Sequence, residues 1–84
     1  MRLDKFLKVS RLIKRRTVAN EACDAARVSV NGKAAKASYT VKIGDEITVA
    51  FGTKSITVRV VELKDTTKKA EAAGMYEIVS ESDS

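Results

Sequence analysis

The sequence contains no histidine, and this absence excludes much of the common chemistry of enzymes. Histidine is the usual general base near neutral pH, the commonest zinc ligand and one half of a Cys–His nucleophile pair. Without it, metal-dependent hydrolysis and triad chemistry have no support in the chain. We therefore expect a protein that is not an enzyme and that binds neither a metal ion nor another cofactor.

Cysteine, tryptophan and long apolar runs are also scarce or absent. The single cysteine, Cys23, cannot form an internal disulfide, which is typical of a reducing compartment. With two Phe, two Tyr and no Trp, the core must be built mainly from Val, Leu, Ile and Ala. No apolar run approaches the roughly 18 to 20 residues of a membrane span, and the N-terminus lacks the features of a signal peptide. We expect a cytoplasmic protein with no membrane partner.

Positive charge is what the sequence has in excess, and it is concentrated in one half. Residues 1–42 contain 11 basic and three acidic side chains, whereas residues 43–84 contain five basic and eight acidic ones. The two halves therefore carry net charges of +8 and −3, which give the chain its +5. A surface that served solubility alone would mix the two signs. The separation indicates one electropositive face, as expected of a nucleic-acid-binding protein.

The first 16 residues hold seven of these cations and one acid, Asp4. Three apolar residues have the spacing of one helical face: Leu3, Phe6 and Leu7. Three cations lie opposite them on the same helical wheel: Arg2, Lys5 and Lys8. A short helix would therefore bury its apolar face and direct its cations outward. A polyanion, a membrane surface and plain solvation of a charged surface all remain as explanations at this point.

A second helix is expected after a basic loop. Ser10 is placed to cap a further turn over residues 11–13, and Thr17 is a suitable N-cap for a helix that runs to about Ala26. The apolar face of this helix is predicted to consist of small residues, with two more at its margin: Val18, Ala22, Ala25 and Ala26, then Ala19 and Cys23.

Beyond Arg27 the hydrophobic period changes from 3.6 to 2, which predicts strands. Asn31-Gly32 is the strongest short signal for a type I′ hairpin turn, because both central residues need a positive φ. Alternation then predicts strands over 46–51 and 55–61, a short helix capped by Asp65 or a neighbouring threonine and stopped by Gly74 at C′, and an edge strand over 75–79. The sequence predicts one domain, 1–84, of the α+β class: two short N-terminal helices on a small, mainly antiparallel sheet, a short C-terminal helix and a frayed tail at 80–84.

Four short motifs, in this order and spacing, resemble the S-four RNA-binding domain, also called the alpha-L motif. They are Arg2-Leu3-Asp4, Arg15-Arg16-Thr17, Val30-Asn31-Gly32-Lys33 and Ile43-Gly44-Asp45. The resemblance covers about residues 2–50 and leaves 51–79 as a C-terminal strand and helix extension. It implies that the first two helices and their connecting loop face RNA, while the strands act as a scaffold.

Within that family the chain looks most like the RqcP group of ribosome-associated quality control, which is related to the heat-shock protein fifteen group. The longer basic C-terminal extension of the latter group is absent here. The resemblance implies a monomeric factor on obstructed large ribosomal subunits that contacts large-subunit rRNA and the P-site peptidyl-tRNA. It also implies support for alanine tailing of the stalled nascent chain alongside an RqcH-type tailing factor.

The residues expected to bind RNA are the cations of the first two helices and their loop, a helix-start hydroxyl and a hairpin lysine: Arg2, Lys5, Lys8, Arg11, Lys14, Arg15, Arg16, Thr17 and Lys33. Arg2 and Arg16 carry most weight, because a guanidinium holds phosphate oxygens bidentately and stacks on bases. Asp4 is better explained as structural, paired with a nearby arginine. The alternatives are a solvated cationic face, a general rRNA-binding or ribosome-assembly protein, and an accessory subunit of a separate RNA-modifying enzyme. A membrane-surface helix ranks last, because the first helix is short.

Overall fold

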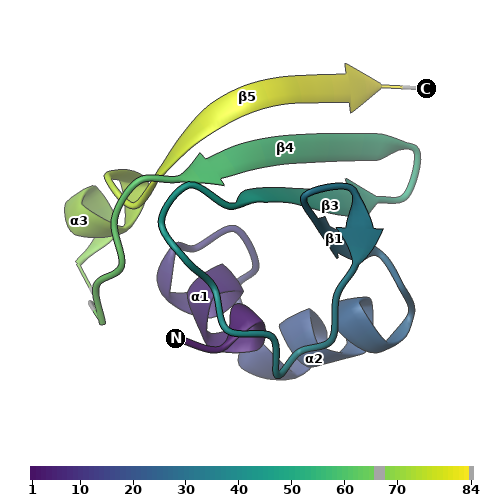
Figure 1. Ribbon diagram of the computed structural model, residues 1–84, viewed down its shortest axis with the longest axis horizontal. Coiled ribbons are helices and arrows are strands. Elements are labelled where there is room, and N and C mark those ends of the chain that lie inside the picture. The colour runs from purple at the N-terminus through teal and green to yellow at the C-terminus, as the bar shows by residue number, and fades with distance from the viewer. Residues whose placement is uncertain (66–67, 84) are drawn as a thin grey trace.

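The computed structural model describes residues 1–65 and 68–83, and this part of the chain folds into helices packed on one antiparallel sheet (Figure 1). The helices are α1 (Leu3–Val9), α2 (Arg16–Asp24) and α3 (Lys69–Ala73). The strands are β1 (Val28–Val30), β2 (Lys33–Ala34), β3 (Glu46–Phe51), β4 (Lys54–Val60) and β5 (Tyr76–Asp83). Their order across the sheet is β2-β1-β3-β4-β5, and every neighbouring pair is antiparallel. The predicted α+β class is confirmed.

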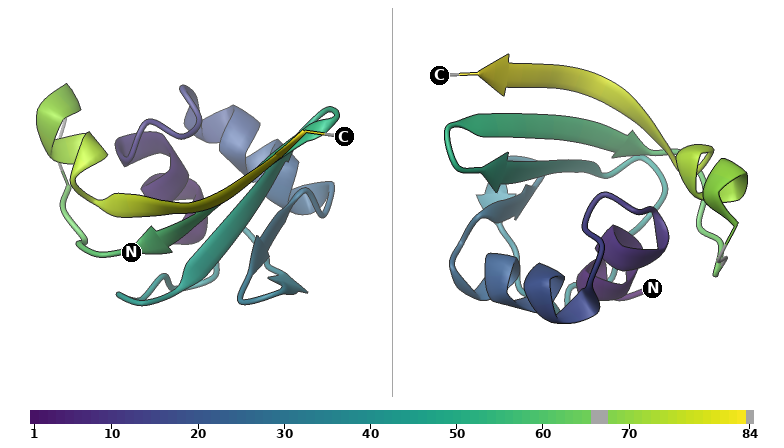
Figure 2. Two further views of the ribbon diagram at one scale, coloured as in Figure 1. Left: turned by 90° about the horizontal axis from the view of Figure 1, so that it is seen from above. Right: turned by 180° about the vertical axis from the view of Figure 1, so that it is seen from behind.

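The core lies between the sheet and the layer formed by α1 and α2, whereas α3 lies beyond one end of the sheet (Figures 1 and 2). Leu3, Phe6 and Leu7 on α1 are fully buried, as their helical spacing predicted. The sheet contributes alternate aliphatic residues to the same core: Val28, Val30, Ile47, Val49, Val58 and Val60. Burial of such side chains is worth roughly 1.5–3 kcal/mol each, so this layer fixes α1 on the sheet. No helix among residues 1–65 and 68–83 has the length and apolarity to cross a membrane.

The hairpin between β1 and β2 has the turn that the sequence predicts. Val30 pairs with Lys33, so the loop between them consists of Asn31 and Gly32. Their φ angles are 53° and 85°, the left-handed values that a type I′ turn requires. The predicted turn is confirmed.

The end of α1 differs from the prediction. Ser10 is the C-terminal cap of α1, and its buried hydroxyl donates to the carbonyl of Leu7 at 3.3 Å. Arg11 then takes a left-handed φ of 64°, which stops the helix and reverses the chain. The predicted turn capped by Ser10 over 11–13 is therefore wrong, because the hydroxyl satisfies a carbonyl of the preceding helix instead.

The start and the buried face of α2 also differ from the prediction. Arg15, in an extended conformation and without a side-chain cap, is the N-cap, so Thr17 lies inside the helix and is exposed. Ala19 and Cys23 are the buried residues, whereas Val18 is 45% exposed. The helix is rotated by about one residue relative to the predicted face. Its docking against α1 and β1 decides the rotation, since small side chains specify a face weakly.

The C-terminal part of the chain is more ordered than the sequence suggests. Helix α3 has Lys68 as its N-cap rather than Asp65, and the neighbouring Thr66 and Thr67 lie outside the described residues. Gly74 is the C-cap with a right-handed φ of −81°, so the predicted role at C′ is wrong. β5 continues past Val79 and pairs with β4 as far as Asp83. The predicted fraying is therefore wrong for residues 80–83.

The connection between β2 and β3 runs back past the start of α1. The backbone N–H of Leu3 donates to the carbonyl of Tyr39 at 2.8 Å, and Arg2 and Thr40 form an isolated antiparallel bridge. The N–H of Val41 donates to the carbonyl of Met1 at 2.8 Å. These bonds fix the N-terminus against residues 37–41 and place this connection beside the first cations of the chain.

Candidate nucleic-acid interface

A buried carboxylate lies among the cations of the first two helices. Asp4, in the first turn of α1, is only 2% exposed and accepts a hydrogen bond from the backbone N–H of Lys5 at 2.8 Å. A buried charge is stable only when it is paired and hydrogen-bonded. The partners that satisfy Asp4 therefore determine what this surface presents.

Two arginines from different elements share that carboxylate. Arg2, the N-cap of α1, donates from Nε to one carboxylate oxygen of Asp4 at 3.2 Å. Arg16, the first residue of α2, donates from Nε to the other oxygen at 3.3 Å. Each adds a longer bond of 3.5 Å from Nη2, and the side-chain amide of Asn20 donates at 3.5 Å. We call Arg2, Asp4 and Arg16 the arginine clamp.

The electrostatics of Asp4 follow from this geometry. Burial, the largest single influence, raises the pKa of Asp4, but the hydrogen bonds from Arg16 and from the backbone of Lys5, together with both guanidinium charges, outweigh it. The net effect holds the pKa of Asp4 below its usual value. Asp4 is therefore ionised at neutral pH, and the arginine clamp carries a net charge of +1.

The arginine clamp leaves hydrogen-bonding capacity toward solvent. The side chains of Arg2 and Arg16 are 52% and 51% exposed, while that of Asp4 is 3% exposed. A guanidinium has five N–H donors, and each arginine directs two of them to Asp4. The remaining donors suit phosphate oxygens, and the shared carboxylate fixes the orientation of both planar groups. Asp4 is thus structural, as the sequence predicts.

The other expected cations lie on the same two helices and their connection. Lys5 pairs with Asp65 at 2.9 Å, so part of its charge is compensated within the chain. Lys8 is exposed on α1, while Arg11, Lys14 and Arg15 are exposed on the connection to α2. Thr17 lines a shallow hollow of about 390 Å³ together with Asp4, Arg16, Asn20 and the acidic Glu21. The two helices and their connection therefore bring eight of the nine expected residues into one layer. We call α1, α2 and their connection the basic layer.

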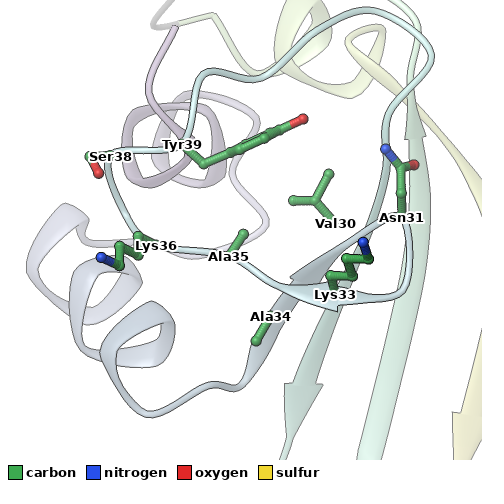
Figure 3. A pocket seen from close by; sticks show the side chains of 8 residues that line it. All are labelled: Val30, Asn31, Lys33, Ala34, Ala35, Lys36, Ser38 and Tyr39. Atoms are coloured by element: carbon green, nitrogen blue, oxygen red, sulfur yellow. The ribbon is translucent and has the colours of Figure 1, made fainter.

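Lys33 lies apart from these eight residues, on β2. It lines a separate pocket together with Lys36 and Tyr39 (Figure 3). Lys36 and Tyr39 were not among the expected site residues, because neither belongs to a motif and a single aromatic carries no periodic signal.

A second buried carboxylate, Asp45, organises this part of the chain. Asp45 is 8% exposed and accepts hydrogen bonds from the Tyr39 hydroxyl at 2.8 Å, the backbone N–H of Lys42 at 3.0 Å and the Asn31 side chain at 3.1 Å. Burial, the largest single influence, raises the pKa of Asp45. The three hydrogen bonds and the charge of Lys42 together lower it by more, so the net shift is downward. The Asn31-Gly32 and Gly44-Asp45 motifs are thus joined directly.

The face of the sheet opposite the helices is electrically mixed. Arg59 on β4 alternates with the buried Val58 and Val60 and pairs with Glu46 at 3.2 Å and with Glu77 at 3.9 Å. Its side chain is 45% exposed, close to the values for the arginine clamp. Arg59 therefore offers a matched arginine outside the basic layer.

Chemically reactive groups are not gathered on this surface. Burial, the largest influence, raises the pKa of the Cys23 thiol to about 11, with smaller contributions from Asp4 and Asp24, so the thiol stays protonated. Within the described ranges 1–65 and 68–83, no three His, Cys, Asp or Glu side chains are grouped to hold a metal ion. The arrangement is suited to binding a polyanion.

Comparison with known proteins agrees with this geometry. Residues 1–47 match the model of the S4 domain family. The chain is 69% identical over 81 residues to the RQC P-site tRNA stabilizing factor of Bacillus subtilis, covering 96% of this chain and 94% of that one. It is 59% identical to the protein of that name in Streptococcus pneumoniae, covering 96% and 92%. The trimeric structure of Vibrio cholerae heat shock protein 15 superimposes with a TM-score of 0.87 at 32% identity, covering 94% and 81%.

Proposed function

Because the chain belongs to the S4 domain family and, within it, to the RQC P-site tRNA stabilizing factors, we propose that it binds RNA on the ribosome in ribosome-associated quality control and acts there on tRNA. Its role is that of a non-catalytic factor in the cytoplasm. The exposed cations gathered on the first two helices and their connection support binding to a polyanion.

The finer proposal concerns the particle that is bound. The protein, as a single copy, binds an obstructed large ribosomal subunit and contacts both large-subunit rRNA and the peptidyl-tRNA in the P site. By holding that tRNA it supports alanine tailing of the stalled nascent chain by an RqcH-type tailing factor. The family resemblance supports this proposal, and the basic layer supplies the chemistry for two RNA contacts.

The observation that carries the proposal is the arginine clamp. Two half-exposed guanidinium groups from α1 and α2 are oriented by one buried carboxylate. Such preorganisation lowers the conformational entropy that arginine side chains lose when they bind phosphate. Lys8, Lys14 and Arg15 then add phosphate contacts and faster association around a fixed centre.

The test is co-sedimentation with large subunits that carry peptidyl-tRNA, using Arg2→Ala and Arg16→Ala. Each variant loses charge-assisted hydrogen bonds, so we expect binding to weaken about tenfold or more. Arg59→Ala removes the same charge from a residue of similar exposure on the far face of the sheet, so it serves as the matched control. Circular dichroism and thermal unfolding establish that each variant is folded.

The outcome is decided by comparing the loss of binding in the two clamp variants with that in Arg59→Ala. Equal loss with Arg59→Ala would indicate a general charge effect, and unchanged binding by both clamp variants would rule out the proposed interface. Recovery of the wild-type protein on immature particles instead of peptidyl-tRNA complexes would favour a role in ribosome assembly. Recovery with an RNA-modifying enzyme would favour an accessory subunit.

A further inference from the structure

A pocket of about 620 Å³ opens between the β1–β2 hairpin and the segment that follows it (Figure 3). This volume falls within the roughly 300–1,000 Å³ typical of small-ligand sites. Its lining comes from β1, the turn, β2 and the following segment: Val30, Asn31, Lys33, Ala34, Ala35, Lys36, Ser38 and Tyr39. We call it the hairpin pocket.

The lining selects a ligand that is apolar in one part and anionic in another. Val30, Ala35 and the ring of Tyr39 form the apolar wall, and the ring extends across the pocket (Figure 3). Lys33 and Lys36 are both exposed and lie on opposite sides of the pocket, and the Lys36 side chain points away from Lys33 (Figure 3). Among the residues that the structure describes, no acidic side chain lines the hairpin pocket. A nucleotide, which joins a flat base to a phosphate, has this combination of properties.

The aromatic wall is held in one position before any ligand arrives. The Tyr39 hydroxyl donates to the buried carboxylate of Asp45 at 2.8 Å, and Asn31 donates to the same carboxylate. The hydrogen bond to Asp45, the largest influence, raises the pKa of Tyr39, so the ring is neutral at physiological pH. A fixed, neutral ring is a suitable stacking platform for a base.

The segment that lines the hairpin pocket is also hydrogen-bonded to the start of α1. The carbonyl of Tyr39 accepts from the N–H of Leu3 at 2.8 Å, and the carbonyl of Ala37 accepts from the N–H of Asp4 at 3.2 Å. The segment that lines the pocket therefore also supports the backbone of the residues that hold the two arginines.

We propose that the hairpin pocket binds one unpaired RNA nucleotide, with its base stacked on Tyr39 and its phosphate held by Lys33. This inference rests on the proposed RNA-binding function and adds a base contact to the phosphate contacts of the arginine clamp. Stacking tolerates any base, because every base has a π face. The hairpin pocket therefore distinguishes unpaired from paired RNA rather than one sequence from another.

The test uses two RNA probes of the same stem sequence: a fluorescently labelled hairpin with an unpaired loop and a blunt duplex without one. Fluorescence anisotropy of each probe is measured with the full chain and with Tyr39→Leu, which removes the ring. We expect Tyr39→Leu to weaken binding of the looped hairpin about tenfold and to leave the duplex within twofold. Tyr39→Phe, which keeps the ring, is expected to bind the looped hairpin nearly as well as the wild type.

Two matched controls separate stacking from disturbance of the fold. Tyr76→Leu removes the other tyrosine, half-buried on β5, and is expected to bind both probes like the wild type. Ala34→Glu adds a carboxylate at an exposed site in the hairpin pocket and is expected to weaken binding of the looped hairpin. Ser82→Glu adds the same charge on β5 and is expected to have little effect.

The results distinguish this inference from the proposed function. If Arg2→Ala loses both probes while Tyr39→Leu and Ala34→Glu bind the looped hairpin like the wild type, the protein binds RNA but the hairpin pocket does not hold a nucleotide. If Arg2→Ala binds both probes normally, the interface itself is wrong. An equal loss on both probes with Tyr39→Leu also overturns the pocket, since stacking requires an unpaired base.

Discussion

Single residues at the basic face act through one buried acid. Asp4 is surrounded by Arg2, Arg16 and Asn20, and this set of contacts converts three separate positions in the sequence into one surface. The motifs Arg2-Leu3-Asp4 and Arg15-Arg16-Thr17 predicted the cations and the structural role of Asp4. They did not predict that both arginines share the carboxylate, because that depends on how α2 docks against α1.

The first prediction concerns Asp4→Asn. The substitution removes the buried charge but leaves two adjacent guanidiniums without their counterion, so we expect the free energy of unfolding at pH 7 to fall by about 1–3 kcal/mol. Urea unfolding followed by circular dichroism measures the change. Glu81→Gln, which neutralises an exposed acid on β5, is the control and is expected to change stability little. An unchanged free energy of unfolding in Asp4→Asn would show that the arginine clamp does not stabilise the fold.

The second prediction is the pH dependence of stability. The folded-state pKa values of Asp4 and Asp45 lie below the ordinary value of 3.8, so the unfolded chain binds protons more readily in acid. The stability contributed by these carboxylates is therefore present above about pH 4 and is lost as the pH falls through the folded-state values. Urea unfolding between pH 7 and pH 3 is expected to show this loss in the wild type and a shallower decline in Asp4→Asn. The same decline of stability with pH in the wild type and in Asp4→Asn would contradict this prediction.

At the level of elements, each of the two N-terminal helices is followed by a non-glycine residue in a left-handed conformation. Arg11 follows α1 with a φ of 64°, and Ala26 follows α2 with a φ of 58°. After α2, the N–H of Arg27 donates to the carbonyl of Ala22 and that of Ala26 donates to Cys23, which is the Schellman arrangement. An L-residue in this conformation costs roughly 1–2 kcal/mol relative to its usual one.

The third prediction follows from this geometry. Ala26→Gly relieves the left-handed strain and is expected to raise the free energy of unfolding by about 1 kcal/mol. Ala25→Gly is the matched control, because Ala25 has a φ of −85° and gains nothing from glycine. Urea unfolding of both variants gives the comparison. A loss of stability in Ala26→Gly as large as that in Ala25→Gly would contradict the expectation.

The elements also show how far the sequence predicts this fold. Asn31-Gly32 and the alternation in β3 and β4 specify local geometry strongly, so the hairpin turn and β3 were predicted correctly and β4 to within one residue at each end. The rotation of α2 and the length of β5 depend on partners distant in the sequence. β5 alternates little, with exposed Ile78 beside exposed Val79, and it is ordered through pairing with β4. Tyr39 escaped prediction for the same reason, since its role arises from contact with Asp45.

In the whole molecule, positive charge is gathered in the layer of α1, α2 and their connection. The sheet on which they pack ends in β5, which contributes Glu77 and Glu81 and no basic residue (Figure 1). A field of this shape directs the basic layer toward a polyanion during encounter and accelerates association at low salt.

The fourth prediction tests this polarity. Lys14→Glu, in the connection between α1 and α2, and Lys54→Glu, at the start of β4, change the net charge by the same amount at exposed positions. We expect Lys14→Glu to slow association with RNA and to lower the salt dependence of binding by about one counterion, whereas Lys54→Glu has a smaller effect. Stopped-flow association rates at several salt concentrations provide the measurement. Equal effects would show that only total charge matters.

The acidic edge at β5 has a consequence for the direction from which RNA can approach. When the helical layer lies on RNA, that strand points outward and presents carboxylates to its surroundings. A nucleic-acid segment that arrives from that side meets repulsion, so the RNA contacts of the proposed function are expected to fall on the two N-terminal helices and their connection. The side of the molecule at β5 is therefore expected to stay free of RNA.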